Sequence, residues 1–174
     1  MQQALKGRNE VNAEYFISAL GLEKHPEGGY YREIYKTGDM IADNGLSNRF
    51  DGNRHLATSI YFLLKSGEVS RFHRLKSDEL WYYHAGSSLT VYAIMQDGGL
   101  KEFRLGLNLE AGELPQVVIP KGCIFGAVVN GGNSFTLMGC MVSPGFDFAD
   151  FELLPREKLM TLFPQYAVII GLLT

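Results

Sequence analysis

The feature that most constrains the fold of this 174-residue chain is a succession of short apolar segments separated by turns. The turns between them are rich in glycine, asparagine and aspartate, as in 97–99 and 130–133. Short strands at this regular spacing are typical of an all-β sandwich or barrel, and not of alternating strand–helix units. The expected strands cover residues 30–35, 58–64, 69–75, 79–84, 88–96, 101–105, 116–119, 124–129 and 134–142.

Helical patterns flank this β region at both ends. Asn12 can cap a first helix with an apolar stripe at helical spacing, and Gly21 ends it. Pro155 suits the first turn of a C-terminal helix, and the following segment 165–173 is apolar on every side. We expect that segment to pack across the barrel or to join a subunit interface. The sequence shows no internal boundary, so one domain over residues 1–174 is predicted.

The charge and the cysteine content of the chain limit which partners and which cellular compartment are expected for it. The net charge is −3, and no stretch gathers lysine and arginine into a block, so neither nucleic acid nor a membrane surface is an expected partner. The N-terminus lacks the apolar core of a secretion signal. The apolar stretch 166–173 is far shorter than the ~20 residues of a membrane helix. Cys123 and Cys140 are interpreted as buried free thiols of a cytoplasmic protein, with a disulfide or a reactive thiol as the alternative.

A histidine and a carboxylate occupy neighbouring predicted strands in the segment 67–86. Gly67 is followed by His73, Glu79 and Gly86. Adjacent strands can point both polar side chains at one interior point, which is how a small β-barrel builds a metal or catalytic site. Because side chains alternate along a strand, the neighbours expected to point inward are Arg71, Leu75, Trp81 and Tyr83.

This segment resembles the first signature of the cupin superfamily, G(X)5HXH(X)3,4E(X)6G. Gly67, His73, Glu79 and Gly86 are in register with it, and Leu75 stands where a second histidine is expected. The second signature, G(X)5PXG(X)2H(X)3N, is represented only in part.

In the second signature, Pro120-Lys121-Gly122 supplies the centre. Phe125 stands at the histidine position and Val129 at the asparagine position, and the preceding glycine is displaced to Gly112.

Three separated blocks carry a closer resemblance over nearly the whole chain. The segments 25–33 (HPEGGYYRE), 73–81 (HRLKSDELW) and 143–152 (SPGFDFADFE) are similar to an uncharacterised branch of cupins, the cupin-5 group. The resemblance implies an all-β, double-stranded β-helix (jelly-roll) barrel with an N-terminal helix and C-terminal helices. It also implies a homodimer, an interior pocket and no agreed reaction, and it makes Leu75 a feature of this branch.

A metal centre at the superfamily's site would lack ligands in this chain. The corresponding set is His73, Leu75, Glu79 and Phe125, of which the leucine and the phenylalanine carry no donor. Catalytic metals typically keep three protein ligands and an open position, so His84 would have to turn inward. We expect no cofactor, with a weakly bound divalent metal as the alternative.

Without a metal, His73 and Glu79 form a candidate acid–base pair. A carboxylate bonded to one imidazole nitrogen fixes the tautomer and leaves the other nitrogen as a general base. This arrangement resembles the metal-free sugar-nucleotide epimerases of the superfamily, which use a histidine base and a tyrosine acid. Tyr83 is the candidate acid, with Tyr31 and Tyr61 as alternatives. The other interpretation is that the pair only satisfies itself inside the barrel.

Four further side chains are candidates for ligand binding. Arg32 and Arg71 could hold a carboxylate or phosphate through the guanidinium fork, or form ordinary salt bridges. Trp81 offers a flat wall for a sugar or ring, or belongs to the core, and Tyr31 joins it as a ligand-binding candidate.

The remaining polar residues receive structural interpretations. Asp147 and Asp150 are expected to cap a turn beside a Pro-Gly pair. His25 and His55 lie in loop-like contexts and are expected to face solvent.

Three functions follow from these features. The first is a small-molecule isomerase or epimerase, independent of metal, acting on a sugar or small polar acid with His73 as base. The second is a cupin that binds a small ligand, or has a structural role, without catalysis. The third is a metal-dependent cupin oxygenase. Cupin barrels host many unrelated activities, so the fold does not choose among them.

Overall fold

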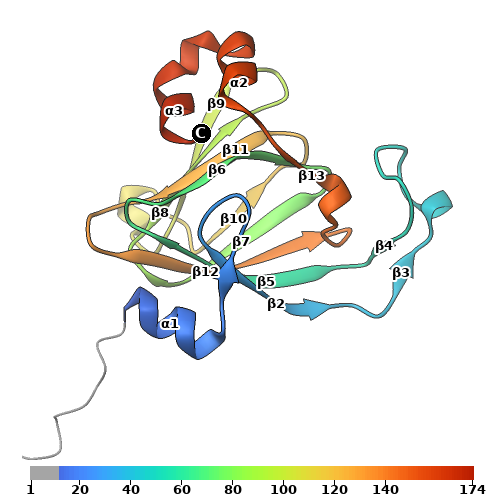
Figure 1. Cartoon of the computed structure of the whole chain (residues 1–174), viewed down its shortest axis with the longest axis horizontal. Helices are drawn as coiled ribbons and strands as arrows, with labels where there is room; N and C mark the ends of the chain where they lie inside the picture. Colours follow the sequence, from blue (N-terminus) through green and yellow to red (C-terminus); the bar gives the residue numbers. More distant parts are fainter. Residues whose placement is uncertain (1–11) are drawn as a thin grey trace, which may run out of the picture.

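The computed structural model describes residues 12–174 and shows two antiparallel sheets packed face to face (Figure 1). The larger sheet carries α1 on its outer face, and the smaller one carries the C-terminal helices. In spatial order the six strands of the larger sheet are β1 (Glu23–Lys24), β2 (Tyr30–Lys36), β5 (Thr58–Lys65), β12 (Phe135–Ser143), β7 (Asp78–Gly86) and β10 (Gln116–Ile119).

The smaller sheet has five strands, and a separate hairpin projects beyond the barrel at the right of Figure 1. That hairpin pairs β3 (Met40–Ile41) with β4 (Arg54–His55) and encloses the short 3₁₀ turn η1 (Asp43–Gly45). In spatial order the five strands are β13 (Phe151–Leu153), β6 (Val69–Leu75), β11 (Ile124–Val129), β8 (Leu89–Ile94) and β9 (Leu100–Leu105).

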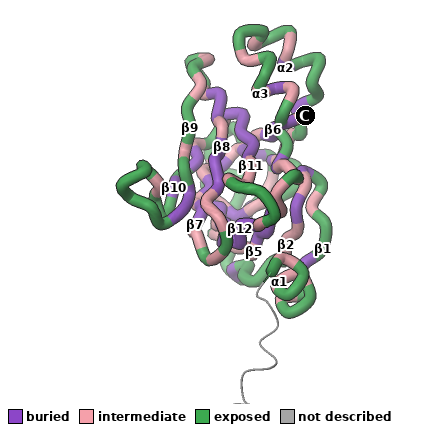
Figure 2. The backbone as a smooth tube through the Cα atoms, turned by 90° about the vertical axis from the view of Figure 1, so that its left-hand side faces the viewer, coloured by how far each residue is buried: buried purple, intermediate pink, exposed green. Residues whose placement is uncertain are grey.

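The main hydrophobic core lies between the two sheets. Strand alternation turns one face of each sheet inward, so Trp81 and Met138 of the larger sheet meet Val91 and Phe125 of the smaller one. These four side chains are at most 1% exposed. Figure 2 shows the same division, with burial concentrated along the central strands and exposure at the hairpin loops and helices.

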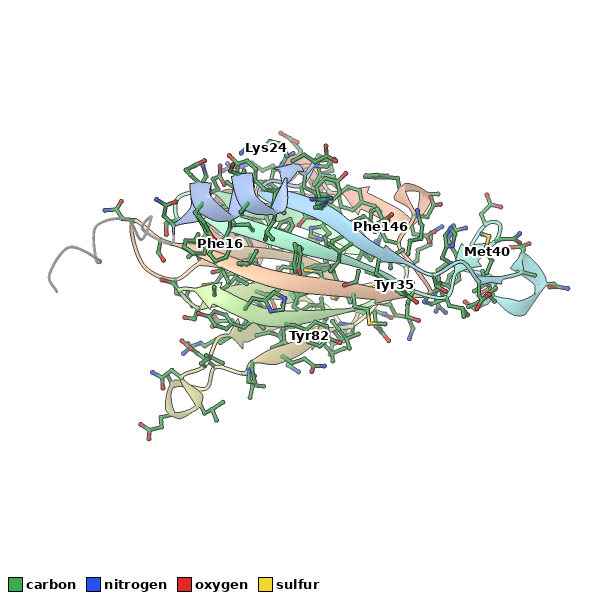
Figure 3. All side chains as sticks on the ribbon, turned by 90° about the horizontal axis from the view of Figure 1, so that it is seen from below. Phe16, Lys24, Tyr35, Met40, Tyr82 and Phe146 are labelled. Atoms are coloured by element: carbon green, nitrogen blue, oxygen red, sulfur yellow. The ribbon has the colours of Figure 1, made fainter. Side chains whose placement is uncertain are left out.

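Helices close the outer faces of both sheets. α1 (Ala13–Leu20) begins at the Asn12 cap, ends at the left-handed Gly21 as predicted, and directs Phe16 at the ring of Phe135, 5.5 Å away (Figure 3). The C-terminal α2 (Arg156–Leu162) and α3 (Ala167–Leu172), joined by the 3₁₀ turn η4 (Pro164–Tyr166), pack on the smaller sheet.

The C-terminal apolar segment packs across the barrel with one face only. Ile170 and Leu173 are fully buried, whereas Val168 is 88% exposed and Leu172 is 51% exposed. Within residues 12–174, no helix is both long and apolar enough to cross a membrane.

The predicted all-β fold with helices at both ends is confirmed. The predicted ranges 69–75, 116–119 and 124–129 coincide with β6, β10 and β11. Residues 38–54, which lie outside the predicted strands, contribute most of the short β3–β4 hairpin, and β13 was not predicted because it has only three residues.

The turn at residues 25–29, before β2, packs directly against β6, and we call it the glycine turn. Gly28 has a φ of +116°, and a Cβ built on it would lie 2.1 Å from the carbonyl oxygen of Val69. The backbone N–H of Arg71 donates to the Glu27 carbonyl at 2.8 Å, which ties the turn to the strand. Only a residue without a side chain permits this approach.

We expect Gly28→Ala to destabilise the protein strongly, and Gly67→Ala is its matched control. Gly67 also has a positive φ, +83°, but an added Cβ would meet nothing within 4 Å. The control should lose about 1–3 kcal/mol through backbone strain alone. The overlap with Val69 should cost Gly28→Ala about 1–3 kcal/mol more. Guanidinium unfolding of both variants measures the difference, and equal losses would contradict the close packing of this turn.

Candidate functional site

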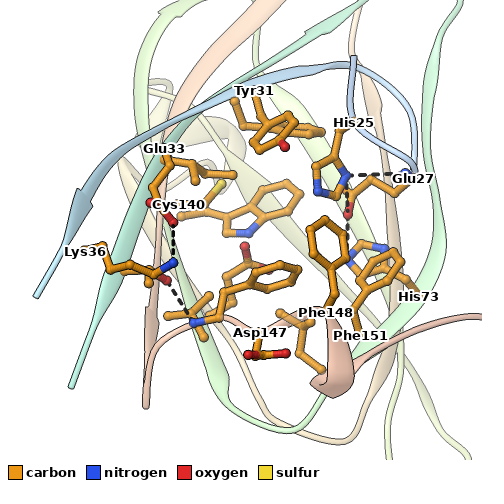
Figure 4. Close-up of a pocket in the computed structure, with 18 of the residues that line it drawn as sticks. His25, Glu27, Tyr31, Glu33, Lys36, His73, Cys140, Asp147, Phe148 and Phe151 are labelled. Atoms are coloured by element: carbon orange, nitrogen blue, oxygen red, sulfur yellow. Dashed lines mark hydrogen bonds and ion pairs between the residues drawn. The ribbon is translucent and has the colours of Figure 1, made fainter. Parts of the chain in front are cut away.

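A cavity of about 370 Å³ opens between the two sheets, next to the glycine turn. Polar groups lie on two sides of it: in Figure 4, His25, Glu27 and His73 are on the right, and Glu33 and Lys36 are opposite them. Aromatic side chains form most of the remaining wall, namely Tyr31, Phe62, Trp81, Phe146, Phe148 and Phe151. The cavity has the size and mixed lining of a site for a small organic molecule.

Glu27 is a buried carboxyl group held between two imidazoles. Its Oε2 lies 3.3 Å from Nε2 of His73 and 3.4 Å from Nδ1 of His25. The hydroxyl of Ser70, on β6, donates to its Oε1 at 2.8 Å. Burial raises the pKa of Glu27, although His25, Ser70 and Arg71 oppose that shift.

His73 has both ring nitrogens engaged. Nδ1 lies 2.7 Å from the carbonyl oxygen of Arg71, which can only accept, so this nitrogen carries a proton. Burial lowers the pKa of His73 to about 4, which leaves Nε2 unprotonated at neutral pH. This unprotonated nitrogen lies 3.3 Å from Oε2 of Glu27, close enough for a proton on either group to be shared between them.

His25 has the opposite orientation. The backbone N–H of Glu27 donates to its Nδ1 at 3.3 Å, which leaves Nε2 to carry the proton of the neutral ring. The ring packs edge-on against Tyr31 at 4.7 Å between centroids and lies near Phe151. Burial lowers the pKa of His25, with Glu27 opposing that effect.

Glu79, on β7, is the second buried carboxyl group of the cavity. Burial first, and then the negative charge of Glu27, raise its pKa to about 8, while the Trp81 side chain opposes the shift. Glu79 is therefore mostly protonated at neutral pH and can donate a hydrogen bond or a proton. The indole Nε1 of Trp81 is buried without a hydrogen-bond partner of good geometry in the described part of the chain.

The predicted pairing of His73 with Glu79 is not what the structure shows. Both side chains line the cavity, but the carboxyl group in contact with the imidazole is that of Glu27. The physical reason is the glycine turn, which inserts Glu27 beside β6. Sequence spacing along two strands carries no information about a loop that arrives from an earlier segment.

Tyr31 and Trp81 line the cavity as expected, whereas Tyr83 does not. The Tyr83 hydroxyl donates to the carbonyl of Gly86, and its backbone N–H donates to Pro115. Tyr83 points inward as predicted and packs against the main core, but it lies farther along β7 than Glu79 and Trp81, beyond the cavity.

The other candidates on the larger sheet also lie outside the cavity lining. Tyr61 and His84 contact each other, with ring centroids 6.1 Å apart, and His84 lies over Gly139.

The two arginines that were candidates for anion binding instead donate hydrogen bonds to backbone carbonyl groups. Arg32 donates to the carbonyl of Leu20 at 2.8 Å, at the end of α1. Arg71 donates to the carbonyls of Pro26 and Glu27, and so it fixes the glycine turn. Arg71 is exposed because the pairing of β6 with β11 shifts register at this point. The cation in the cavity lining is Lys36, 3.5 Å from Glu33.

His25 and Glu27 are the functional candidates that sequence reasoning missed. His25 was expected to face solvent, yet its side chain is only 7% exposed. The available signal was the pair of glycines that follows Glu27, since adjacent glycines of positive φ allow a turn to approach other backbone closely.

The remaining polar predictions had mixed outcomes. Asp147 caps a turn as predicted, accepting from the Ala149 N–H at 2.8 Å. Asp150 instead forms a buried bidentate pair with Arg54 at 2.6 and 2.7 Å. His55 is half-buried, with Nδ1 2.7 Å from the Thr37 carbonyl oxygen.

The residues at the superfamily's metal site do not fit a metal ion. Leu75 lines the cavity without a donor, and the Phe125 ring packs 4.1 Å from that of His73. Across residues 12–174, no three histidine, cysteine, aspartate or glutamate side chains are arranged to hold a metal. We assign no chemical step to one.

Comparison with known proteins agrees with the motifs. The sequence model of the family described as "Cupin superfamily (DUF985)" matches residues 14–154. An uncharacterized protein of Saccharomyces cerevisiae, YML079W, is 30% identical over 153 residues, covering 83% of this chain and 76% of the yeast protein.

Solved structures show the same fold. Protein SO0799 of Shewanella oneidensis is 52% identical, with a TM-score of 0.84 over 94% of this chain and 97% of that one. A hypothetical protein of Leishmania major is 37% identical, with a TM-score of 0.85 over 94% and 98% of the two chains. Oxalate decarboxylase of Bacillus subtilis is 18% identical, with a TM-score of 0.54 over 87% of this chain and 36% of that one, a likeness of fold alone.

The raised pKa of Glu79 predicts a distinctive dependence of stability on pH. Between its ordinary value of 4.5 and about 8, the folded protein keeps a proton that the unfolded chain has released. Stability should therefore fall as pH rises through this window, by at most about 1.4 kcal/mol per unit.

Glu79→Gln removes this contribution, so the variant should gain stability relative to wild type from about pH 5 to pH 8. Urea unfolding across this range measures the gain, and the opposing contribution of His73 cancels because both proteins retain it. The control Glu110→Gln alters an exposed side chain of the 3₁₀ turn η2 (Leu109–Ala111). A constant difference between Glu79→Gln and wild type would contradict a protonated Glu79.

Proposed function

Since the chain belongs to the DUF985 family of the cupin superfamily, we propose that its barrel binds a sugar or another small polar acid and isomerises or epimerises it by proton transfer. The observation that supports this most directly is a pair of buried carboxyl groups in unlike environments. Glu27 contacts two imidazoles and a hydroxyl, whereas Glu79 is kept protonated by burial and by the charge of Glu27. Two carboxyl groups set apart in this way can act as base and acid.

The base in this proposal is Glu27, and His73 acts through it. Both nitrogens of His73 are engaged, so the imidazole cannot reach a ligand directly. As a carboxylate, Glu27 takes a proton from a C–H bond of the ligand and shares it with Nε2 of His73, 3.3 Å away. The electron pair stays on the ligand as an enolate, which the Glu79 carboxyl group protonates on oxygen. Return of a proton to carbon, with Glu79 recovering its own from oxygen, completes the isomerisation.

The cavity walls supply the binding. Aromatic faces such as those of Trp81 and Phe148 can pack against the apolar face of a sugar ring. Lys36, opposite the histidines, can pair with a carboxylate of the ligand. Anion binding is the role that the sequence had suggested for Arg32 and Arg71.

We also propose that the protein works in the cytoplasm as a homodimer. The two cysteines are buried and free, which suits a reducing compartment. The exposed apolar side chains Val168 and Leu172 of α3 are suited to an interface between copies.

The alternative function is binding without turnover. The same aromatic cavity of about 370 Å³ would hold a small ligand, as the lining alone requires no reaction. Native mass spectrometry of freshly purified protein distinguishes the cases: a retained mass with no turnover of the released compound supports binding alone.

Proton transfer predicts exchange of a ligand hydrogen with solvent. Wild-type protein incubated in D₂O with a panel of nucleotide sugars and uronates should incorporate deuterium at carbon, detected by mass spectrometry. Glu27→Gln should slow this exchange by about 10²-fold or more, because the base is lost. Tyr83→Phe serves as the control and should exchange at the wild-type rate, since that hydroxyl lies outside the cavity lining. Equal rates in Glu27→Gln and wild type would remove Glu27 from the mechanism.

A further inference from the structure

A second cavity, of about 490 Å³, lies on the other side of a wall of the barrel pocket. Leu75 and Phe151, cross-strand partners in β6 and β13, line both cavities. We call the second cavity the basic groove, after the four cationic side chains in its lining: Arg49, Arg74, Lys76 and Lys121.

One of the two carboxylates in this groove is already neutralised. Asp150 is buried and accepts two hydrogen bonds from the guanidinium of Arg54, at 2.6 and 2.7 Å. The ammonium of Lys76 lies 3.2 Å from the same carboxylate. Two cations thus surround one acid, and the pKa of Asp150 is held low by them against the effect of burial.

The other carboxylate, that of Glu152, also pairs with two cations. It pairs with Arg74 on the neighbouring strand and with Lys158 of α2, whose Nζ lies 2.9 Å away. Four cations therefore face two carboxylates before the remaining basic residues are considered.

Arg49 adds a positive charge that has no acidic partner within residues 12–174. Its Nε donates to the Lys76 carbonyl at 2.8 Å, and its Nη1 donates to the Ser47 hydroxyl at 2.6 Å. The guanidinium carbon also lies 4.5 Å from the centre of the Phe50 ring. These neutral partners orient the group and leave its charge uncompensated.

Lys121 is only loosely paired. Its Nζ lies 3.9 Å from the Asp78 carboxylate, and that carboxylate already accepts the backbone N–H of Lys121 at 2.7 Å. An exposed pair at this distance contributes little, so the ammonium is free to reach another anion.

From this arrangement we infer that the basic groove is a binding site for a phosphate group. Cations from three separate segments converge on one cavity, in a chain whose net charge is −3. A compact, multiply charged oxyanion matches the oriented guanidinium fork of Arg49 and the ammonium group of Lys121, which is free to reach it. The inference goes beyond the proposed function and does not rest on it.

The test is titration of wild-type protein with inorganic phosphate and, separately, with glucose 1-phosphate. Binding is followed by amide chemical shifts in ¹H–¹⁵N spectra, with shifts expected at Lys76, Lys121 and Gly122. The double variant Arg49→Gln/Lys121→Gln should bind each probe about tenfold or more weakly, since charge-assisted hydrogen bonds are lost. Its matched control is Lys101→Gln/Arg104→Gln, which removes the same charge from exposed positions on β9.

The possible outcomes distinguish free phosphate from an organic phosphate, and a specific site from general charge attraction. Equal affinity for the two probes assigns the groove to free phosphate, and tighter binding of the sugar phosphate assigns it to an organic phosphate. An equal loss in both double variants would overturn the site, leaving general charge attraction only, as would shifts confined to other amides. Glu27→Gln should retain phosphate binding, so failure of the proposed reaction and failure of this inference give different results.

Discussion

The site depends on the contact between the glycine turn and β6. Because Gly28 has no side chain, the turn approaches the Val69 carbonyl closely enough to place the Glu27 carboxyl group inside the barrel. Burying a carboxyl group is costly unless its oxygens find partners. The Ser70 hydroxyl donates to one oxygen, the imidazoles of His25 and His73 lie beside the other, and Arg71 holds the backbone of the turn from outside. The same insertion raises the pKa of Glu79, since two carboxylates cannot easily ionise in one dry cavity.

The barrel provides a rigid frame for this contact. The sheets meet through a close-packed core, and helices cover both outer faces, so the strand residues of the cavity wall are held in place by strand pairing. Leu75 and Phe125 stand where the superfamily signatures have histidines, so apolar side chains replace potential metal ligands in the barrel interior. The Phe125 ring packs against His73 at the position where the superfamily signature has a histidine. Low water access strengthens the interaction of the remaining polar groups, which is why a few side chains can shift one another's pKa.

The basic groove and the barrel pocket lie on opposite sides of one wall and have opposite character. The pocket is lined by acids, imidazoles and aromatic rings, whereas the groove gathers cations. Strand alternation alone does not set the boundary between the two cavities. Leu75 and Phe151 line both of them, and Lys76, which lines the groove, follows directly after β6. A chain of modest negative charge can thus carry a locally positive site, because tertiary structure brings together residues from distant segments.

The architecture is predictable from the amino-acid sequence, because the period of apolar residues and the positions of turn residues are local properties. β6, β10 and β11 were predicted to the residue, and so were the Asn12 cap and the Gly21 stop of α1. The sequence also placed His73, Glu79, Tyr31 and Trp81 at one cavity. The partners of these side chains follow only from the folded molecule. The pairing of His73 with Glu27 depends on a long-range loop contact, and the outward position of Arg71 depends on a register shift between β6 and β11. Such features arise from packing between segments far apart in the chain, which no local periodicity records.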